Sequence, residues 1–187
     1  MCFTWLPCYG RRVRRNVVSQ KGIFLKLFIK LLAFLLPFIG NAQDKNSFDP
    51  FLIEDWSVGQ SELNGKPIYL RSNIGFKEFK NKEGYPYRIG FAFPLLNPKS
   101  NGLPTDDEMN QLNEIEDLLD NKLVQKKYAF LTLVITTTGM REFIFYSNKP
   151  DEVKKQIDSI KKSIKNHELQ FYIEKDKSWS VYKEFTN

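Results

Sequence analysis

The sequence is poor in the side chains that most enzymes use for nucleophilic or metal chemistry. Its 187 residues include two cysteines, Cys2 and Cys8, and one histidine, His167. Both cysteines fall in the N-terminal leader described below, so the rest of the chain predicts no disulfide and no thiolate nucleophile. One histidine without cysteine does not supply the usual zinc ligand set. We interpret His167, between a predicted helix and a predicted strand, as an exposed loop residue or a helix end.

Two further kinds of catalytic motif are missing. No serine lies in a Gly-x-Ser-x-Gly turn, the common nucleophile motif of hydrolases. No glycine-rich loop of the kind that cradles phosphates is present. The sequence therefore predicts no catalytic residue, no metal site and no cofactor.

Acidic residues are absent from residues 1–42, which contain seven Lys and Arg. This basic stretch leads into an apolar run from Leu31 to Ile39, followed by the small residues Gly40 and Ala42. The order predicts a signal peptide over residues 1–42, cleaved after Ala42, and an exported protein that is periplasmic or secreted. The apolar run is shorter than the ~20 residues that span a bilayer. The alternative is an uncleaved anchor that tethers the domain to the membrane.

The leader also carries the excess positive charge of the chain. The whole sequence has a net charge of +6, from 28 Lys and Arg against 22 Asp and Glu. Without the seven basic residues of the leader, 21 remain against the same 22 acids, which gives a net charge of −1. Nucleic-acid binding requires a basic patch on the folded domain itself. We therefore predict no nucleic-acid partner, and a membrane contact only through an uncleaved leader.

The remaining sequence predicts a flexible linker over residues 43–50 and a single domain over residues 51–187. The domain begins with a predicted hairpin, whose strands at 51–58 and 67–71 flank the turn signal Asn64-Gly65. A loop follows at residues 76–84.

Residues 85–174 predict the order strand, helix, strand, strand, helix, strand. Thr105 and Glu108 form a predicted capping box at the start of the first helix, with the glutamate reaching back to the cap. This order is typical of an α+β fold with the ferredoxin-like split βαβ arrangement, in which both helices cover one face of an antiparallel sheet. The N-terminal hairpin is expected to extend the sheet or to cover its other face. The predicted strands are 85–93, 128–138, 140–146 and 169–173.

Several short runs of the sequence carry a family resemblance. They are Trp56 with Asn64-Gly65-Lys66-Pro67, Gly102-Leu103-Pro104, Glu114 with Leu118, Thr138 to Tyr146, and Trp179 to Phe185. Together they resemble the domain-of-unknown-function 695 family, over roughly residues 51–186. This resemblance implies no activity. A more distant similarity is to the regulator of ribonuclease E activity B, a small cytoplasmic inhibitor, whose role does not fit an exported protein.

Four side chains are candidates for ligand binding: Arg141, Tyr146, Trp179 and Tyr182. Arg141 starts a strand beside a tight turn, where its guanidinium can make a forked contact to a carboxylate or phosphate. Trp179 and Tyr182 are three residues apart, so a helical tail presents them on one side. The alternative is that the aromatics only pin the tail to the domain. Arg141 then pairs with an acid such as Glu184 or Asp176.

These observations favour an exported, non-catalytic module that binds another molecule, most simply another protein. One alternative is an inhibitor or regulator of an envelope enzyme, by analogy with the distant relative. Another is a hydrolase that uses carboxylates together with Arg141. A deep pocket with Arg141 and two carboxylates would favour the hydrolase, whereas a flat aromatic surface would favour a binding protein.

Overall fold

The computed structural model describes residues 49–63, 66–137 and 139–186. The predicted leader, most of the predicted linker and the Asn64-Gly65 turn lie outside these residues. Within the described ranges, no helix combines the length and apolar character that crossing a membrane requires. Asp49 and Pro50, assigned to the linker by the sequence, already belong to the domain. The Asp49 side chain caps the short 3₁₀ turn η1 (Pro50–Leu52), and Pro50 is buried.

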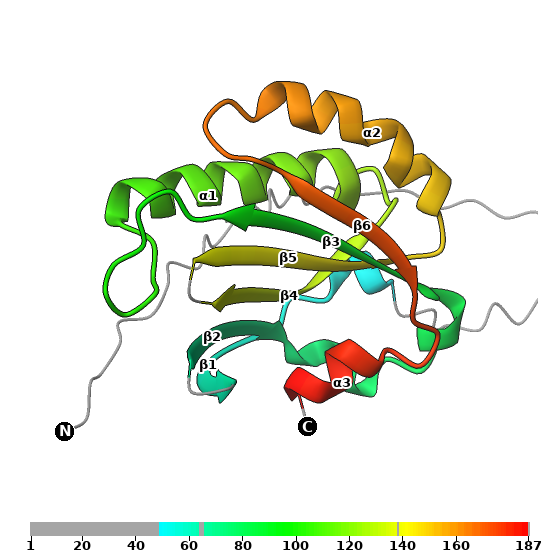
Figure 1. The fold of residues 1–187 in the computed structure, drawn as a ribbon. Coiled ribbons are helices and arrows are strands. Elements are labelled where there is room, and N and C mark those ends of the chain that lie inside the picture. The colour runs from blue at the N-terminus through cyan, green and yellow to red at the C-terminus, as the bar shows by residue number, and fades with distance from the viewer. Residues whose placement is uncertain (1–48, 64–65, 138, 187) are drawn as a thin grey trace, which may run out of the picture. The chain divides into compact units, whose positions relative to one another are not determined.

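A six-stranded antiparallel sheet forms the centre of the domain (Figure 1). The strand order is β1-β2-β4-β5-β3-β6. Each of the two long helices therefore joins strands that have one other strand between them. The bounds are β1 (Trp56–Leu63), β2 (Lys66–Asn73), β3 (Tyr87–Pro94), β4 (Phe130–Thr137), β5 (Met140–Ser147) and β6 (Gln170–Lys175).

Two predictions at the start of the domain are wrong. The strand expected over residues 51–58 begins only at Trp56. Asp49 Oδ1 accepts a hydrogen bond from the Phe51 amide at 3.1 Å, and this local contact favours a turn over extended backbone. The loop expected over residues 76–84 contains most of η2 (Ile74–Glu78) and all of η3 (Lys82–Gly84). The turn η2 forms because it buries the ring of Phe76.

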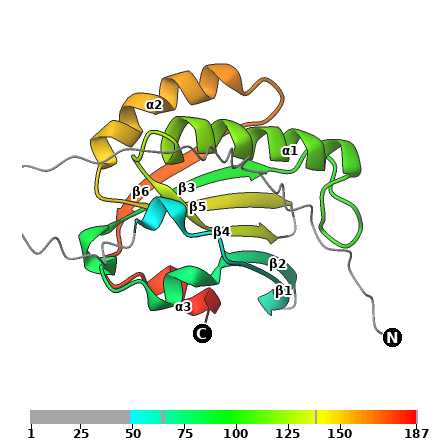
Figure 2. The same ribbon diagram turned by 180° about the vertical axis from the view of Figure 1, so that it is seen from behind.

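Both long helices pack on one face of the sheet, as the sequence predicts (Figures 1 and 2). They are α1 (Asp106–Leu119), which continues into the wider turn η4 (Asp120–Val124), and α2 (Pro150–Ser163). Their apolar stripes and the inward side chains of the central strands form one core. That core contains Leu112, Ile115, Leu119, Val153, Ile157 and Ile160 from the helices and Ile89, Phe91, Phe93, Val134, Phe143 and Phe145 from the strands.

The C-terminal helix α3 (Ser180–Thr186) lies on the other side of the sheet from α1 and α2 (Figure 1). It belongs to a second, strongly aromatic core together with η2 and the opposite faces of β4 and β5. The domain is thus a mixed α+β structure with a six-stranded sheet and three α-helices in the described part of the chain. The buried members of the second core are Ile68, Phe76, Phe79, Phe130, Leu133, Ile135, Ile144, Tyr146, Trp179 and Tyr182.

Candidate functional site

A groove of about 190 Å³ lies beside α1, over strands β2, β4 and β5. Two arginines line it, Arg71 from β2 and Arg141 from β5. None of the described residues that line it is Asp or Glu. We call this surface the arginine groove. Its other lining residues are Val58, Tyr69, Leu70, Met109, Asn113, Val134 and Thr136.

Strand register places Arg141 on the sheet face that carries α1. Arg141 is opposite Thr136, and Thr136 is opposite Tyr69, so the three residues form a row across the sheet. Arg141 Nε donates to Thr136 Oγ1 at 3.0 Å, and Arg141 Nη1 lies 3.1 Å from Met109 Sδ. In the described part of the chain, no carboxylate lies within ion-pair distance of this guanidinium.

Arg141 is only 8% exposed. A buried charge is costly unless an opposite charge and hydrogen bonds compensate it. Burial, followed by the nearby positive charge of Arg71, lowers the pKa of the Arg141 guanidinium. The carboxylates of Glu116 and Glu108 act in the opposite direction without overcoming these two effects. Packing of the domain alone therefore gives no reason for a charged side chain at this position.

Arg71 has a different environment, although it lines the same groove. Its Nη2 donates to Glu116 Oε1 on α1, and its guanidinium carbon lies 4.9 Å from the centre of the Trp56 ring. Arg71 Nε is buried and has no hydrogen-bond partner among the described residues. One of the two arginines is thus neutralised by an acid at the edge of the groove, and the other is not.

The structure brings together three of the four predicted site residues. The ring of Trp179 stacks on that of Tyr146, with centroids 4.0 Å apart, and Tyr182 packs against Trp179 edge-on at 5.6 Å. The Trp179 indole donates to the Tyr85 carbonyl at 3.1 Å, and the Tyr182 hydroxyl donates to the Asn73 carbonyl at 2.7 Å. The prediction that the tail packs onto the domain is confirmed.

Arg141 does not join this aromatic group. It lies on the helix-covered face with Met109, whereas Tyr146 belongs to the core on the opposite face. Arg141 and Tyr146 are five residues apart on one strand, and side chains an odd number apart point to opposite faces. The spacing of the two residues in the sequence therefore already predicts that they lie on opposite faces of the sheet. Pairing of Arg141 with Asp176 is also wrong, because Asp176 binds the Tyr146 hydroxyl on the other face.

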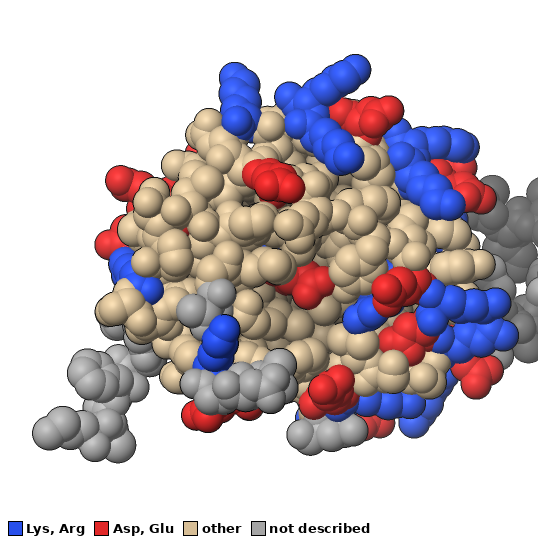
Figure 3. Space-filling view, in the orientation of Figure 1, with Lys and Arg blue, Asp and Glu red and all other residues tan. Residues whose placement is uncertain are grey.

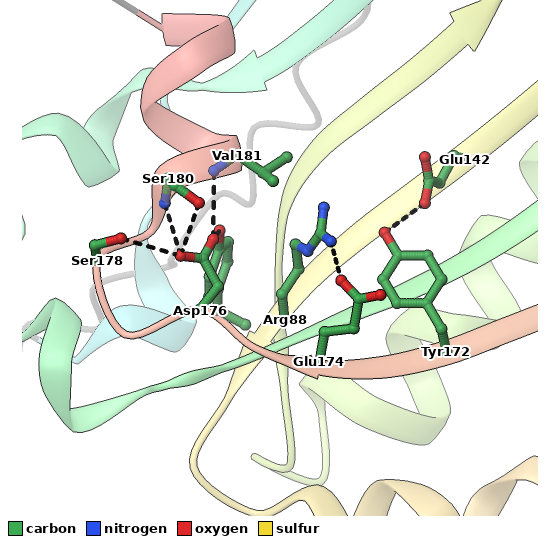
Figure 4. Close-up of polar contacts among 9 residues, drawn as sticks. Arg88, Glu142, Tyr172, Glu174, Asp176, Ser178, Ser180 and Val181 are labelled. Carbon is green, nitrogen blue, oxygen red and sulfur yellow. Dashed lines mark hydrogen bonds and ion pairs between the residues drawn. The ribbon is translucent and has the colours of Figure 1, made fainter.

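Asp176 fixes the start of α3 (Figure 4). Its carboxylate accepts hydrogen bonds from the Ser180 amide at 2.8 Å, the Val181 amide at 3.3 Å and the Tyr146 hydroxyl at 2.7 Å. Burial alone would raise the pKa of this carboxyl, but the hydrogen bonds outweigh it, so the pKa of Asp176 is lowered. Burial and the bond to Asp176 raise the pKa of the Tyr146 hydroxyl. These contacts attach the tail to the domain. This structural role explains why Tyr146, Trp179 and Tyr182 lie together, without a ligand.

A family model described as "Family of unknown function (DUF695)" matches residues 54–186. The chain belongs to the DUF695 family. The family resemblance read from the short sequence runs is thereby confirmed. No curated protein and no solved structure matches the chain. The similarity to the regulator of ribonuclease E activity B stays a prediction.

The DUF695 domain contains a buried pair that the sequence did not predict. His167 Nε2 lies 3.3 Å from Glu108 Oε1, with side chains only 1% and 5% exposed, respectively. His167 is therefore not an exposed loop residue. The capping box is also only half formed. Thr105 Oγ1 accepts from the Glu108 amide, but Glu108 accepts from the Leu96 amide instead of reaching back to the cap. The sequence could have indicated this burial, because Glu108 is a charged residue on the inward side of α1.

A polar cluster lies on the sheet face opposite α1 and α2 of the DUF695 domain (Figure 4). Arg88 of β3 pairs with Glu174 of β6, and the Tyr172 hydroxyl donates to Glu142 of β5 at 2.6 Å. The Tyr172 ring lies over Gly90, where an added Cβ atom would come within 2.2 Å of it. Figure 3 shows this face: charged side chains gather mainly around its edge, and uncharged ones occupy most of the middle. Arg88 and Glu174 neutralise each other, and the Glu142 carboxylate accepts a hydrogen bond from the uncharged Tyr172 hydroxyl.

The acidic face of α1 does not form a metal site in the DUF695 domain. No group of three or more His, Cys, Asp or Glu side chains suited to holding a metal ion occurs among the described residues. The exposed carboxylates of α1, such as Glu114, are a solvated helix face. The arginine groove therefore stands out, because it contains a buried charge, the Arg141 guanidinium, that no described ion pair balances.

Proposed function

We propose that this protein is an exported, non-catalytic binding module that takes an anionic group in the arginine groove. One observation carries the proposal: the buried guanidinium of Arg141 lines the groove without a carboxylate partner among the residues that the structure describes. An anion bound there would supply the missing opposite charge, and a guanidinium recognises carboxylate and phosphate groups through parallel hydrogen bonds. Export rests on the basic, apolar and small-residue order of the leader.

The chemistry of the groove favours binding over hydrolysis. A hydrolase that uses a carboxylate pair needs both carboxylates at the bound substrate. The described lining of the arginine groove contains none. The aromatic side chains of the tail are buried, so they do not provide the flat aromatic surface that a binding protein could also use.

A second candidate is a protein-interaction module, including an inhibitor or regulator of an envelope enzyme. The edge strand β1 favours it. This strand is eight residues long, pairs continuously with β2, and contains no Lys or Pro, the residues that commonly protect sheet edges. Val58, at its centre, is 81% exposed. Capture of partner proteins from the native envelope with the processed protein, identified by mass spectrometry, tests this candidate. Val58→Pro should abolish the capture of any partner that binds along the edge strand β1.

We also propose that the α+β core is ferredoxin-like. The strand order β4-β5-β3-β6 and the two crossing helices on one face support this assignment. The hairpin β1–β2 extends that sheet next to β4. An experimental structure with α1 and α2 on opposite faces would contradict the assignment.

Thermal unfolding of the exported, processed protein tests the principal proposal. A ligand that binds only the folded state raises the unfolding temperature. At constant ionic strength, acetate, sulfate or phosphate should raise this temperature relative to chloride more in the wild type than in Arg141→Met, because the general stabilising effect of these salts acts on both proteins. Arg88→Met, which removes an arginine already paired with Glu174, is the matched control and should respond as the wild type does. Equal responses of Arg141→Met and the wild type would contradict the proposal.

A further inference from the structure

We infer that the ligand of the arginine groove is a small monocarboxylate with a short apolar body. This inference rests on the proposed function, because it names the chemical class of ligand for the same groove. Three features of the groove lead to it: its charge, its size and the side chains that surround the arginines.

The charges favour a single negative charge on the ligand. Arg71 and Arg141 bring two positive charges, and Glu116 neutralises one of them through its pair with Arg71. Glu108 also acts on Arg141 electrostatically, but its carboxylate is held by the Leu96 amide and faces His167. One bound monoanion therefore matches the Arg141 guanidinium, which pairs with no acid within the described ranges. A dianion would bring a second negative charge that has no counterpart in the groove.

The size of the groove favours a small molecule. Its volume of about 190 Å³ is below the ~300–1,000 Å³ of pockets that hold drug-sized ligands. A carboxylate that carries only a few carbons is a ligand of this smaller class.

The neighbours of the arginines favour an apolar body. Aliphatic or thioether side chains from three elements line the groove: Val58, Met109 and Val134. Burial of apolar surface against them contributes about 0.8 kcal/mol per methylene group. A ligand with one carboxylate and a short hydrocarbon chain, such as butyrate, satisfies both the charge and the lining.

This chemistry has two possible sources, a free short-chain acid or the C-terminal carboxylate of a polypeptide that ends in a small apolar residue. Titrations of the processed protein, followed by isothermal calorimetry and by amide NMR shifts, separate them. The probes are sodium acetate, sodium butyrate, butyramide, inorganic phosphate, and acetyl-glycyl-valine as its free acid and as its amide.

We expect butyrate to bind about tenfold more tightly than acetate, because two more methylene groups are buried. Butyramide and the dipeptide amide should not bind measurably, since neither carries a charge. Arg141→Met should abolish butyrate binding, and Arg141→Lys, which keeps the charge but loses the fork, should weaken it at least tenfold. Arg88→Met should bind butyrate as the wild type does. Circular dichroism establishes that each variant is folded.

The outcomes distinguish this inference from the proposed function. If the dipeptide acid binds more than tenfold tighter than butyrate, the monocarboxylate stands and its source is a polypeptide. If phosphate binds more tightly than butyrate through Arg141, the ligand class is wrong while the anion-binding function stands. If butyramide binds as well as butyrate, the charge argument fails. If no probe binds the wild type, both the inference and the proposed function are overturned.

Discussion

Replacement of Arg141 by methionine should make the domain more stable, although it removes the proposed binding function. Methionine keeps an unbranched side chain that fills the space beside Met109 and Thr136, and it removes a charge that is only 8% exposed. Withdrawal of such a charge from water costs several kcal/mol, because none of the described carboxylates contacts it. The substitution loses the hydrogen bond to Thr136, which contributes about 1.5–3 kcal/mol.

The difference between these opposing effects predicts a rise of about 1–2 kcal/mol in the free energy of unfolding. For a domain of this size that rise corresponds to an increase of roughly 2–8 °C in the melting temperature. Urea unfolding, followed by tryptophan fluorescence, measures the free energy directly. Arg141→Lys, which keeps the buried charge and loses the bond to Thr136, should be less stable than the wild type. A loss of more than about 1 kcal/mol in Arg141→Met would mean that the fold needs this arginine, and would refute the reasoning.

Four further predictions concern other parts of the molecule. Trp179→Ala should lower the free energy of unfolding by about 3–5 kcal/mol, because it removes a fully buried ring, and it should leave butyrate binding to the folded fraction unchanged. The pKa of Asp176 is lowered in the folded state, so its carboxylate stabilises the fold above pH ~4. This contribution is lost as the pH falls through the folded-state pKa. The difference in urea midpoint between the wild type and Asp176→Asn should therefore shrink in acid. Gly90→Ala should cost about 1–3 kcal/mol in unfolding free energy, because its Cβ atom meets the ring of Tyr172, and a further change of Tyr172 to Ala should remove most of that cost. Sequencing of the exported protein should find an N-terminus at Gln43, after Ala42; a soluble cytoplasmic product that starts at Met1 would contradict the leader.

Periodicity allowed much of the fold to be predicted. The helical stripe that contains Leu112 and the stripe that contains Ile157 fixed the inward sides of both helices, since a 3.6-residue period leaves one choice of face. Alternation along residues 87–93 likewise identified β3. The start of β1 could not be predicted in this way. Residues 51–55 have strand-forming composition, but the Phe51 amide donates a hydrogen bond to the Asp49 carboxylate, and this contact holds the first of these residues in a turn.

The candidate site depended on both levels. The sequence alone singled out Arg141, because an arginine at the start of a strand beside a tight turn is suited to an anion. The sequence spacing also predicts that Arg141 and Tyr146 lie apart. They are five residues apart on β5, and strand side chains an odd number of residues apart point to opposite faces. Only the tertiary structure placed Arg71 beside Arg141. Strand β4 lies between β2 and β5 in the sheet, and this order of strands cannot be predicted from any local sequence pattern.

Burial was the other property that only the tertiary structure decided. His167 and Glu108 are both polar residues near helix ends, and local propensity favours exposure of such residues. They are buried because α1 and the start of β6 converge from positions 59 residues apart in the chain. In the same way, the lack of a carboxylate beside Arg141 in the described part of the chain depends on every element that packs against this side chain. The sequence identified Arg141 as a candidate, but the assembled fold decides whether its charge has a partner.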